Sequence, residues 1–162
     1  MKKILLIIAI AVSATTNAQV KTVSLQASGL TCSMCSNSIN KALKTLDFVL
    51  KVDADIKTYT FEISFNPNSV IDFDMLRKRV EGAGFSVCGF IANIHFDKLE
   101  VKNNQPLLYE NRIFLFTDLS EQTLSGEKHV KILDKGFVST KEYKMHPSLV
   151  SLSQTYHVTI VP

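Results

Sequence analysis

The 162-residue sequence contains no tryptophan and only three cysteines, four prolines and six glycines. Three cysteines are too few for an exported domain built on a dense disulfide scaffold, and an odd number cannot all pair within one chain. The formal net charge is only +3. A chain so close to neutral gives no support for nucleic-acid binding, which relies on a basic patch or stripe. No low-complexity segment or block of like charge indicates disorder.

The sequence also lacks an apolar run of the roughly 20 residues that a membrane-spanning helix needs. Its longest apolar run, Ile4 to Val12, follows Lys2 and Lys3 and precedes a small and polar stretch. This layout is typical of a secretory signal peptide. We therefore predict a signal peptide at residues 1–18, cleaved after Ala18, and an exported, periplasmic mature chain whose charge is about +1.

The hydrophobic pattern of residues 20–95 predicts six elements in the order β-α-β-β-α-β. Strands are indicated by alternating or apolar runs, and helices by apolar residues at a spacing of three and four. Asp72 is a suitable N-cap for the second helix and Gly84 a suitable stop. The order is that of the α+β ferredoxin-like sandwich, in which two helices cover one face of an antiparallel sheet. The predicted strands are 21–27, 48–56, 58–65 and 85–96, and the predicted helices are 33–46 and 72–84.

After about Phe96 the sequence becomes more polar and breaks into short runs that resemble strands. No run has the periodicity of a convincing helix, although residues 146–154 could hold a single turn. We expect three parts: the signal peptide 1–18, a ferredoxin-like domain at 19–96, and a small β-rich C-terminal region of unknown role at 97–162. The strand-like runs in that last region are 112–116, 129–133, 135–140 and 156–161.

Two of the cysteines, Cys32 and Cys35, lie in the segment GLTCSMC between the first predicted strand and the first predicted helix. Thiolates select soft ions such as Cu(I), zinc and iron–sulfur clusters. A structural zinc site or an iron–sulfur cluster takes about four ligands, and the first histidine is His95, far along the chain. Two thiolates alone suit near-linear binding of Cu(I) or Hg(II), with Zn(II) as a further alternative.

The position of the pair favours ionised sulfur. Cys35 falls in the first turn of the predicted helix, where backbone N–H groups and the positive end of the helix dipole stabilise a thiolate. Gly29 permits the tight turn out of the strand. The Thr31 hydroxyl can hydrogen-bond within the loop. We expect an exposed loop that suits transfer of an ion better than permanent storage.

This arrangement resembles the heavy-metal-associated domain family, whose pattern is glycine-methionine-threonine-cysteine-x-x-cysteine. Gly29, Thr31, Cys32 and Cys35 match that pattern, and Leu30 replaces the methionine as an apolar plug beneath the loop. The family includes copper chaperones, modules of copper-transporting ATPases and a periplasmic mercury-binding protein. The resemblance extends over about residues 21–92.

The glycine-aromatic pair that the family places beside the metal loop corresponds to Gly84 and Phe85. The resemblance implies that Cys32 and Cys35 bind Cu(I) and pass it on by ligand exchange. The recipient would be a membrane metal transporter or another copper protein. Such a protein is a carrier and not an enzyme.

Two other uses of the cysteine pair stay open. Thioredoxin-like redox proteins also place Cys-x-x-Cys at the start of a helix, but they carry a tryptophan before the motif and a cis-proline loop that faces it. This chain has no tryptophan, and Pro67 lies in a predicted turn before a helix. A structural disulfide between Cys32 and Cys35 is the second alternative. At the level of function, the alternatives are a periplasmic mercury-type scavenger and an interaction module of the cell envelope that binds no metal.

Several other residues have both an ordinary and a functional interpretation. Cys88 is either a buried apolar residue of the fourth strand or a third thiolate or intermolecular bridge. Phe85 is either a core residue or a shield for the metal site. The remaining candidates are Met34 as a ligand, Met145 and His146 with His129 or His157 as a second copper site, and Lys41 and Lys44 as a docking face for an acidic partner.

Overall fold

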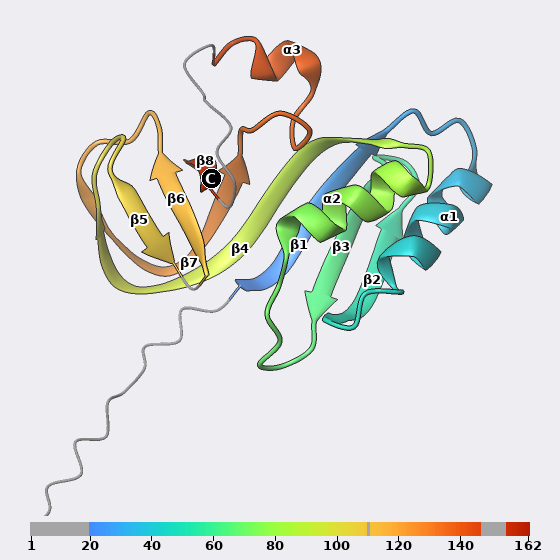
Figure 1. Cartoon of the computed structure of the whole chain (residues 1–162), viewed down its shortest axis with the longest axis horizontal. Helices are drawn as coiled ribbons and strands as arrows, with labels where there is room; N and C mark the ends of the chain where they lie inside the picture. Colours follow the sequence, from blue (N-terminus) through green and yellow to red (C-terminus); the bar gives the residue numbers. More distant parts are fainter. Residues whose placement is uncertain (1–19, 110, 147–154) are drawn as a thin grey trace, which may run out of the picture.

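The computed structural model of the chain describes residues 20–109, 111–146 and 155–162. The predicted signal peptide lies outside this range. The described strands form one eight-stranded sheet in the order β2-β3-β1-β4-β7-β8-β6-β5, and α1 and α2 lie on the same side of its N-terminal half (Figure 1). No helix among the described residues is both long and apolar enough to cross a membrane. The elements are β1 (Val20–Ser28), α1 (Ser33–Leu43), β2 (Val49–Asp55), β3 (Thr60–Phe65), α2 (Phe73–Gly82), β4 (Ser86–Val101), β5 (Pro106–Tyr109), β6 (Arg112–Phe116), β7 (Gln122–Ile132), α3 (Thr140–Tyr143) and β8 (Thr155–Val161).

The first half has the predicted β-α-β-β-α-β order, and its strands pair antiparallel as β2-β3-β1-β4. The alternating pattern explains how these strands face the helices. Leu25 of β1 lies opposite Phe61 of β3 on one side and Phe90 of β4 on the other, and all three are fully buried. The α+β, ferredoxin-like prediction for this half is confirmed.

The second helix begins and ends as predicted. The Asp72 carboxylate accepts a hydrogen bond of 2.9 Å from the Met75 backbone N–H, which is the ordinary N-cap contact. Leu76 and Val80 are fully buried on the face that packs against the sheet. After the helix, Gly84 has a φ of +91°, a left-handed conformation that suits glycine.

Strand β4 is longer than predicted and belongs to both halves of the sheet (Figure 1). It continues past Phe96 to Val101 and pairs with β7 along most of its length. The predicted boundary at residues 96 and 97 therefore falls within a strand. Beyond β7 the sheet continues through β8 and β6 to β5, where β6 and β8 are parallel and the other pairs antiparallel. The C-terminal part is β-rich, as expected.

Two predictions for the C-terminal part were wrong. Residues 135–140 do not form a strand but a turn, with Gly136 at a φ of +87° and one isolated bridge between Lys135 and Val138. A short helix, α3, then follows where none was expected. The Ser139 hydroxyl caps it by accepting a hydrogen bond of 3.2 Å from the Glu142 N–H. The glycine and the serine cap decide the local structure here. Of the predicted turn at 146–154, only His146 lies within the described residues.

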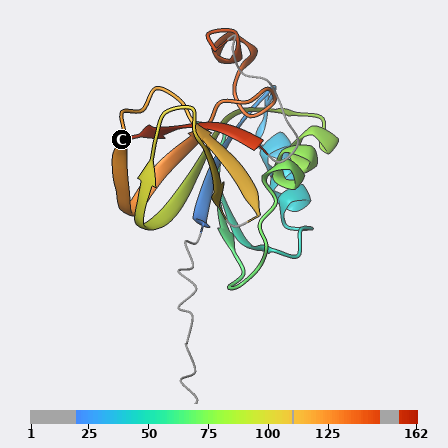
Figure 2. The same ribbon diagram turned by 60° about the vertical axis from the view of Figure 1, so that its left-hand side comes forward.

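Aromatic rings join the two halves into one core. Phe73 of α2 lies 5.1 Å from Phe90 of β4 and 5.6 Å from Tyr156 of β8 between ring centroids. Phe137, from the turn after β7, contacts both Phe90 and Tyr156 edge-on, at 5.2 and 5.6 Å. Figure 2 shows the C-terminal strands curving to one side of the molecule, with α1 and α2 on the other.

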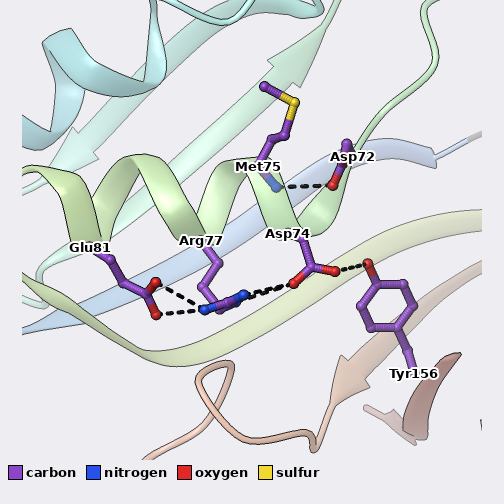
Figure 3. Close-up of polar contacts among 6 residues, drawn as sticks. All are labelled: Asp72, Asp74, Met75, Arg77, Glu81 and Tyr156. Carbon is purple, nitrogen blue, oxygen red and sulfur yellow. Dashed lines mark hydrogen bonds and ion pairs between the residues drawn. The ribbon is translucent and has the colours of Figure 1, made fainter. Parts of the chain in front are cut away.

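Polar contacts on the flank of α2 add to this junction (Figure 3). The Tyr156 hydroxyl donates a hydrogen bond of 2.8 Å to the Asp74 carboxylate. Arg77 lies between Asp74 and Glu81 and forms ion pairs of 2.9 and 2.7 Å with them. The Arg77 guanidinium also lies over the Phe137 ring, 5.5 Å from its centroid. One flank of α2 is therefore held by the C-terminal part of the chain.

Candidate metal site

The loop between β1 and α1 presents the two cysteines at the start of a helix. Gly29 leaves the strand with a φ of +88°, which a residue with a side chain rarely adopts. Leu30 is buried beneath the loop, as expected of an apolar plug. Cys32 is the N-cap residue of α1, with an extended backbone, and Cys35 is the third residue of the helix. The helix therefore begins directly after Cys32, and Cys35 lies within its first turn.

The two sulfur atoms lie together, and no disulfide joins them in this structure. Their Sγ atoms are 3.0 Å apart, and the Cys35 backbone N–H donates a bond of 3.1 Å to the Cys32 carbonyl. Cys32 is exposed and Cys35 half-buried, so the pair can be reached from solvent. Two adjacent, accessible thiols are donors for a soft cation, and they are also close enough to react with each other under oxidising conditions.

The loop stabilises the charged form of one thiol. The pKa of Cys35 falls to about 7, chiefly because the Cys32 thiol donates a hydrogen bond to its sulfur and then because the Thr31 backbone N–H does so. A weaker contribution comes from the Thr31 hydroxyl. Cys35 is therefore substantially ionised at neutral pH and prepared to bind a metal cation.

The glycine-aromatic pair lies beside the loop, as the family pattern implies. A Cβ atom added to Gly29 would lie 4.0 Å from the Phe85 ring, so the ring packs against the backbone of the loop. Phe85 is partly buried and also packs against the hydrophobic core. The structure thus gives Phe85 a core contact and a contact with the metal loop at the same time.

The third cysteine does not join the pair. Cys88 lies at a bulge in β4, where the register shifts between Gln26 and Ala27 of β1. It is half-buried and lines a groove of ≈ 690 Å³ on the sheet face away from the helices, with residues such as Gln26 and Glu62. Burial and the nearby Glu142 carboxylate raise the pKa of the Cys88 thiol. A hydrogen bond with Ser28 lowers it, but the net shift is upward. Cys88 is therefore neither the fully buried core residue expected nor placed as a third ligand.

The candidates in the C-terminal part are also dispersed. His157 is 7% exposed, and its Nδ1 and backbone N–H contact the Asp134 carboxylate at 2.8 and 2.7 Å. That ring is held in a structural pair. Met145 is exposed beyond α3, and His129 is exposed on β7. Across residues 20–109, 111–146 and 155–162, no three His, Cys, Asp or Glu side chains gather as a metal-binding group.

The surface next to the loop carries the other predicted residues. Met34 is 78% exposed and so packs against nothing that buries it. Lys41 and Lys44 are exposed along α1 and its C-cap. These two lysines could contact an acidic partner or could simply form a solvent-exposed face of the helix, and the prediction stays open.

Sequence reasoning missed one residue close to the pair. Ser36 follows Cys35 directly and is only 2% exposed. It lies three residues before Ile39 and seven before Leu43, which are both fully buried. A serine in register with this apolar stripe was the signal that could have identified it.

Comparison with known proteins gives concordant results. Residues 24–86 match the family model of the heavy-metal-associated domain. The mercuric transport protein periplasmic component of Pseudomonas fluorescens is 36% identical over 86 residues, which cover 52% of this chain and 93% of that protein. A probable copper-transporting ATPase of Arabidopsis thaliana, HMA5, is 40% identical over 60 residues, which are 37% of this chain but only 6% of the ATPase.

Among solved structures, the yeast copper transporter domain Ccc2a, studied in its apo and Cu(I)-loaded states, is 31% identical to this chain. The match covers 40% of this chain and 88% of that domain, with a TM-score of 0.37. The family model covers the β1–α1 loop with both cysteines, and the periplasmic relative is covered almost completely. The chain therefore belongs to the heavy-metal-associated domain family.

Proposed function

We propose that this protein binds one Cu(I) ion between Cys32 and Cys35 and carries it to a partner protein. The observation that carries the proposal is the pair of reduced thiols, 3.0 Å apart and open to solvent at the start of α1. Because the pKa of Cys35 is lowered to about 7, little energy is needed to form the thiolate that a soft cation prefers.

The number of donors supports Cu(I) over ions that take more ligands. Zinc in a structural site takes four ligands. No third His, Cys, Asp or Glu joins the pair within the described residues. Two thiolates satisfy a cation that accepts two-coordinate binding, and they exclude hard ions, which prefer oxygen.

Transfer would proceed by ligand exchange without a change of oxidation state. A thiolate or thioether of the partner adds to the bound Cu(I), giving a three-coordinate ion, and one of the two original sulfurs then leaves. The exposure of Cys32 leaves room for an incoming ligand. This step needs no catalytic residue, so the proposed role is carriage and not enzymatic turnover.

The proposed location is outside the cytoplasm. Residues 1–18 have the sequence pattern of a signal peptide, and the relative from Pseudomonas fluorescens is named as a periplasmic component. The recipient would then be a membrane metal transporter or another copper protein of the envelope. A reducing partner would also be needed there, because exported thiol pairs tend to oxidise.

Mercury binding is the second candidate. It is favoured by the periplasmic mercuric transport relative, of which the match covers 93%. Hg(II) also accepts two thiolates in a near-linear arrangement. The same two residues would then hold Hg(II) for scavenging instead of delivering Cu(I).

Titration of the reduced protein with Cu(I) against a competing chelator tests the proposal. We expect one ion per chain at sub-micromolar or tighter affinity, lost in the Cys32→Ser/Cys35→Ser variant. The matched control is Cys88→Ser, which should bind as the wild type does, because Cys88 lies on the other face of the sheet. Equal binding by the double variant would reject the proposal. Parallel titration with Hg(II) ranks the two ions.

A further inference from the structure

Ser36 is an unusual residue to find beneath the metal loop. It is 2% exposed, and its Oγ atom has no hydrogen-bond partner among the residues that the structure describes. A buried hydroxyl without a partner destabilises a fold, whereas alanine would fill nearly the same space at no such cost. No contact in the metal-free structure therefore explains why a hydroxyl group occupies this position.

The spacing along α1 directs this hydroxyl toward the metal site. Ser36 follows Cys32, the N-cap residue, by four positions, so it lies about one helical turn after the residue at which the helix begins. The Cα–Cβ bond of a helical residue tilts toward the N-terminus, so the Ser36 side chain points back to the first turn. The Cys32 side chain accepts no capping hydrogen bond from the helix. A donor without an acceptor thus lies one turn below a sulfur that no cap contact uses.

We propose that Ser36 is a positioning residue of the metal site, whose hydroxyl donates a hydrogen bond to the Cys32 sulfur when a metal ion holds that sulfur as a thiolate. A neutral thiol is a weak acceptor, whereas a charged sulfur is a much stronger one. The hydroxyl is therefore unsatisfied in the metal-free chain and satisfied in the loaded chain. This inference rests on the proposed function, because the cation supplies the thiolate.

The proposal predicts effects of opposite sign on stability and on affinity. Ser36→Ala removes the unsatisfied hydroxyl, so the urea midpoint of the metal-free chain should rise. The same variant removes a donor to the charged sulfur, so the Kd for Cu(I) should rise about tenfold, which corresponds to about 1.4 kcal/mol. Ser36→Thr keeps a hydroxyl and should restore most of the affinity, whatever its extra methyl group does to packing.

Ser38→Ala is the matched control on the same helix. The Ser38 hydroxyl is exposed and donates to the Met34 carbonyl at 3.1 Å, so its loss should leave the Kd within about twofold of the wild type. Both serine variants gain the helix propensity of alanine. A difference between them therefore reports the Ser36 hydroxyl and not propensity.

The outcomes separate the inference from the proposed function. A Ser36→Ala variant with the affinity of the wild type, or with a lower urea midpoint, would overturn the role of Ser36 while leaving Cu(I) binding intact. A wild-type chain that binds no Cu(I) would instead overturn the proposed function and the inference with it. A raised midpoint with a weakened affinity, rescued by threonine, would support both.

Discussion

Replacement of Cys32 by alanine should slow the reaction of Cys35 with alkylating reagents at neutral pH. The Cys32 thiol is the largest cause of the lowered pKa of Cys35, which is about 7 in place of 9.0. Without that hydrogen bond the pKa should rise toward 9.0, while the contacts with Thr31 keep part of the effect. Alanine is the right replacement, because a serine hydroxyl would still donate.

The size of the effect follows from the fraction of thiolate. At pH 7 a thiol of pKa 7 is about half ionised, and full reversion to 9.0 would leave about 1%. A thiolate of higher pKa is also intrinsically more nucleophilic, by up to about tenfold over two pKa units. With full reversion, the net rate of Cys35 alkylation at pH 7 should therefore fall by at least about fivefold, and by less where the contacts with Thr31 keep part of the shift; at pH 10 the variant should react faster than the wild type.

The assay is alkylation by iodoacetamide from pH 5 to pH 10, with peptide mapping by mass spectrometry to assign each site. Cys88 is the internal control, because burial raises its pKa and it should react slowly in both proteins. We expect the midpoint for Cys35 near pH 7 in the wild type and well above it in Cys32→Ala. An unchanged midpoint would refute the assignment of Cys32 as the main stabilising donor.

Three further predictions concern stability, measured by urea unfolding of the metal-free chain. Phe90→Ala should cost about 3–5 kcal/mol, because Phe90 is fully buried between Phe73 and Phe137; a loss below about 1 kcal/mol would contradict a core shared by both halves. Tyr156→Phe should cost about 1 kcal/mol through loss of the hydrogen bond to Asp74, and this loss should disappear in an Asp74→Ala background, which has no acceptor, if that bond is its cause. Asp72→Ala should cost about 1 kcal/mol through loss of the helix cap; Asp72→Ser should retain most of the stability, and an equal loss in both would contradict capping.

The N-terminal half could be predicted because its signals are local. The alternation in β3 places Phe61 and Ile63 on the buried face, and the helical spacing of Leu76 and Val80 does the same for α2. The capping role of Asp72 follows from its position before an apolar stripe. In each of these elements the local preference and the tertiary packing agree, so the secondary structure can be predicted from the sequence alone.

The extension of β4 could not be predicted because its cause is not local. Three of the four residues 97–100 are charged, and Lys98 has a φ of +48° at a register shift between Phe96 and Leu99. Pairing with β7 nonetheless continues to Val101. Hydrogen bonds from a distant strand outweigh the local polar pattern here.

The buried polar groups of the C-terminal part were missed for a similar reason. The sequence offers His157 only as a possible member of a second copper site, yet it is buried against Asp134, which lies 23 positions earlier in the chain. Arg112 is buried over the Phe73 ring, 4.4 Å from its centroid, although arginine is mostly exposed. Such partners meet only when the sheet is assembled, so the sequence around each residue gives no sign of them.

At the site, too, some features follow from the local sequence and others depend on distant contacts. The Cys-x-x-Cys motif and its place before a helix identified Cys32 and Cys35 from the sequence. The burial of Ser36 and the position of Cys88 on the opposite face depend on the packing of α1 and on a bulge in β4. The motif thus selects the two cysteines as candidate donors, and the structure is needed to see what surrounds them.

X-ray absorption spectroscopy of the Cu(I)-loaded, full-length protein tests the central claim most directly. We expect a copper ion surrounded by two sulfur atoms and no nitrogen or oxygen, in wild type and in Cys88→Ser alike. Copper bound through nitrogen or oxygen, or the same spectrum in a chain without Cys32 and Cys35, would contradict it.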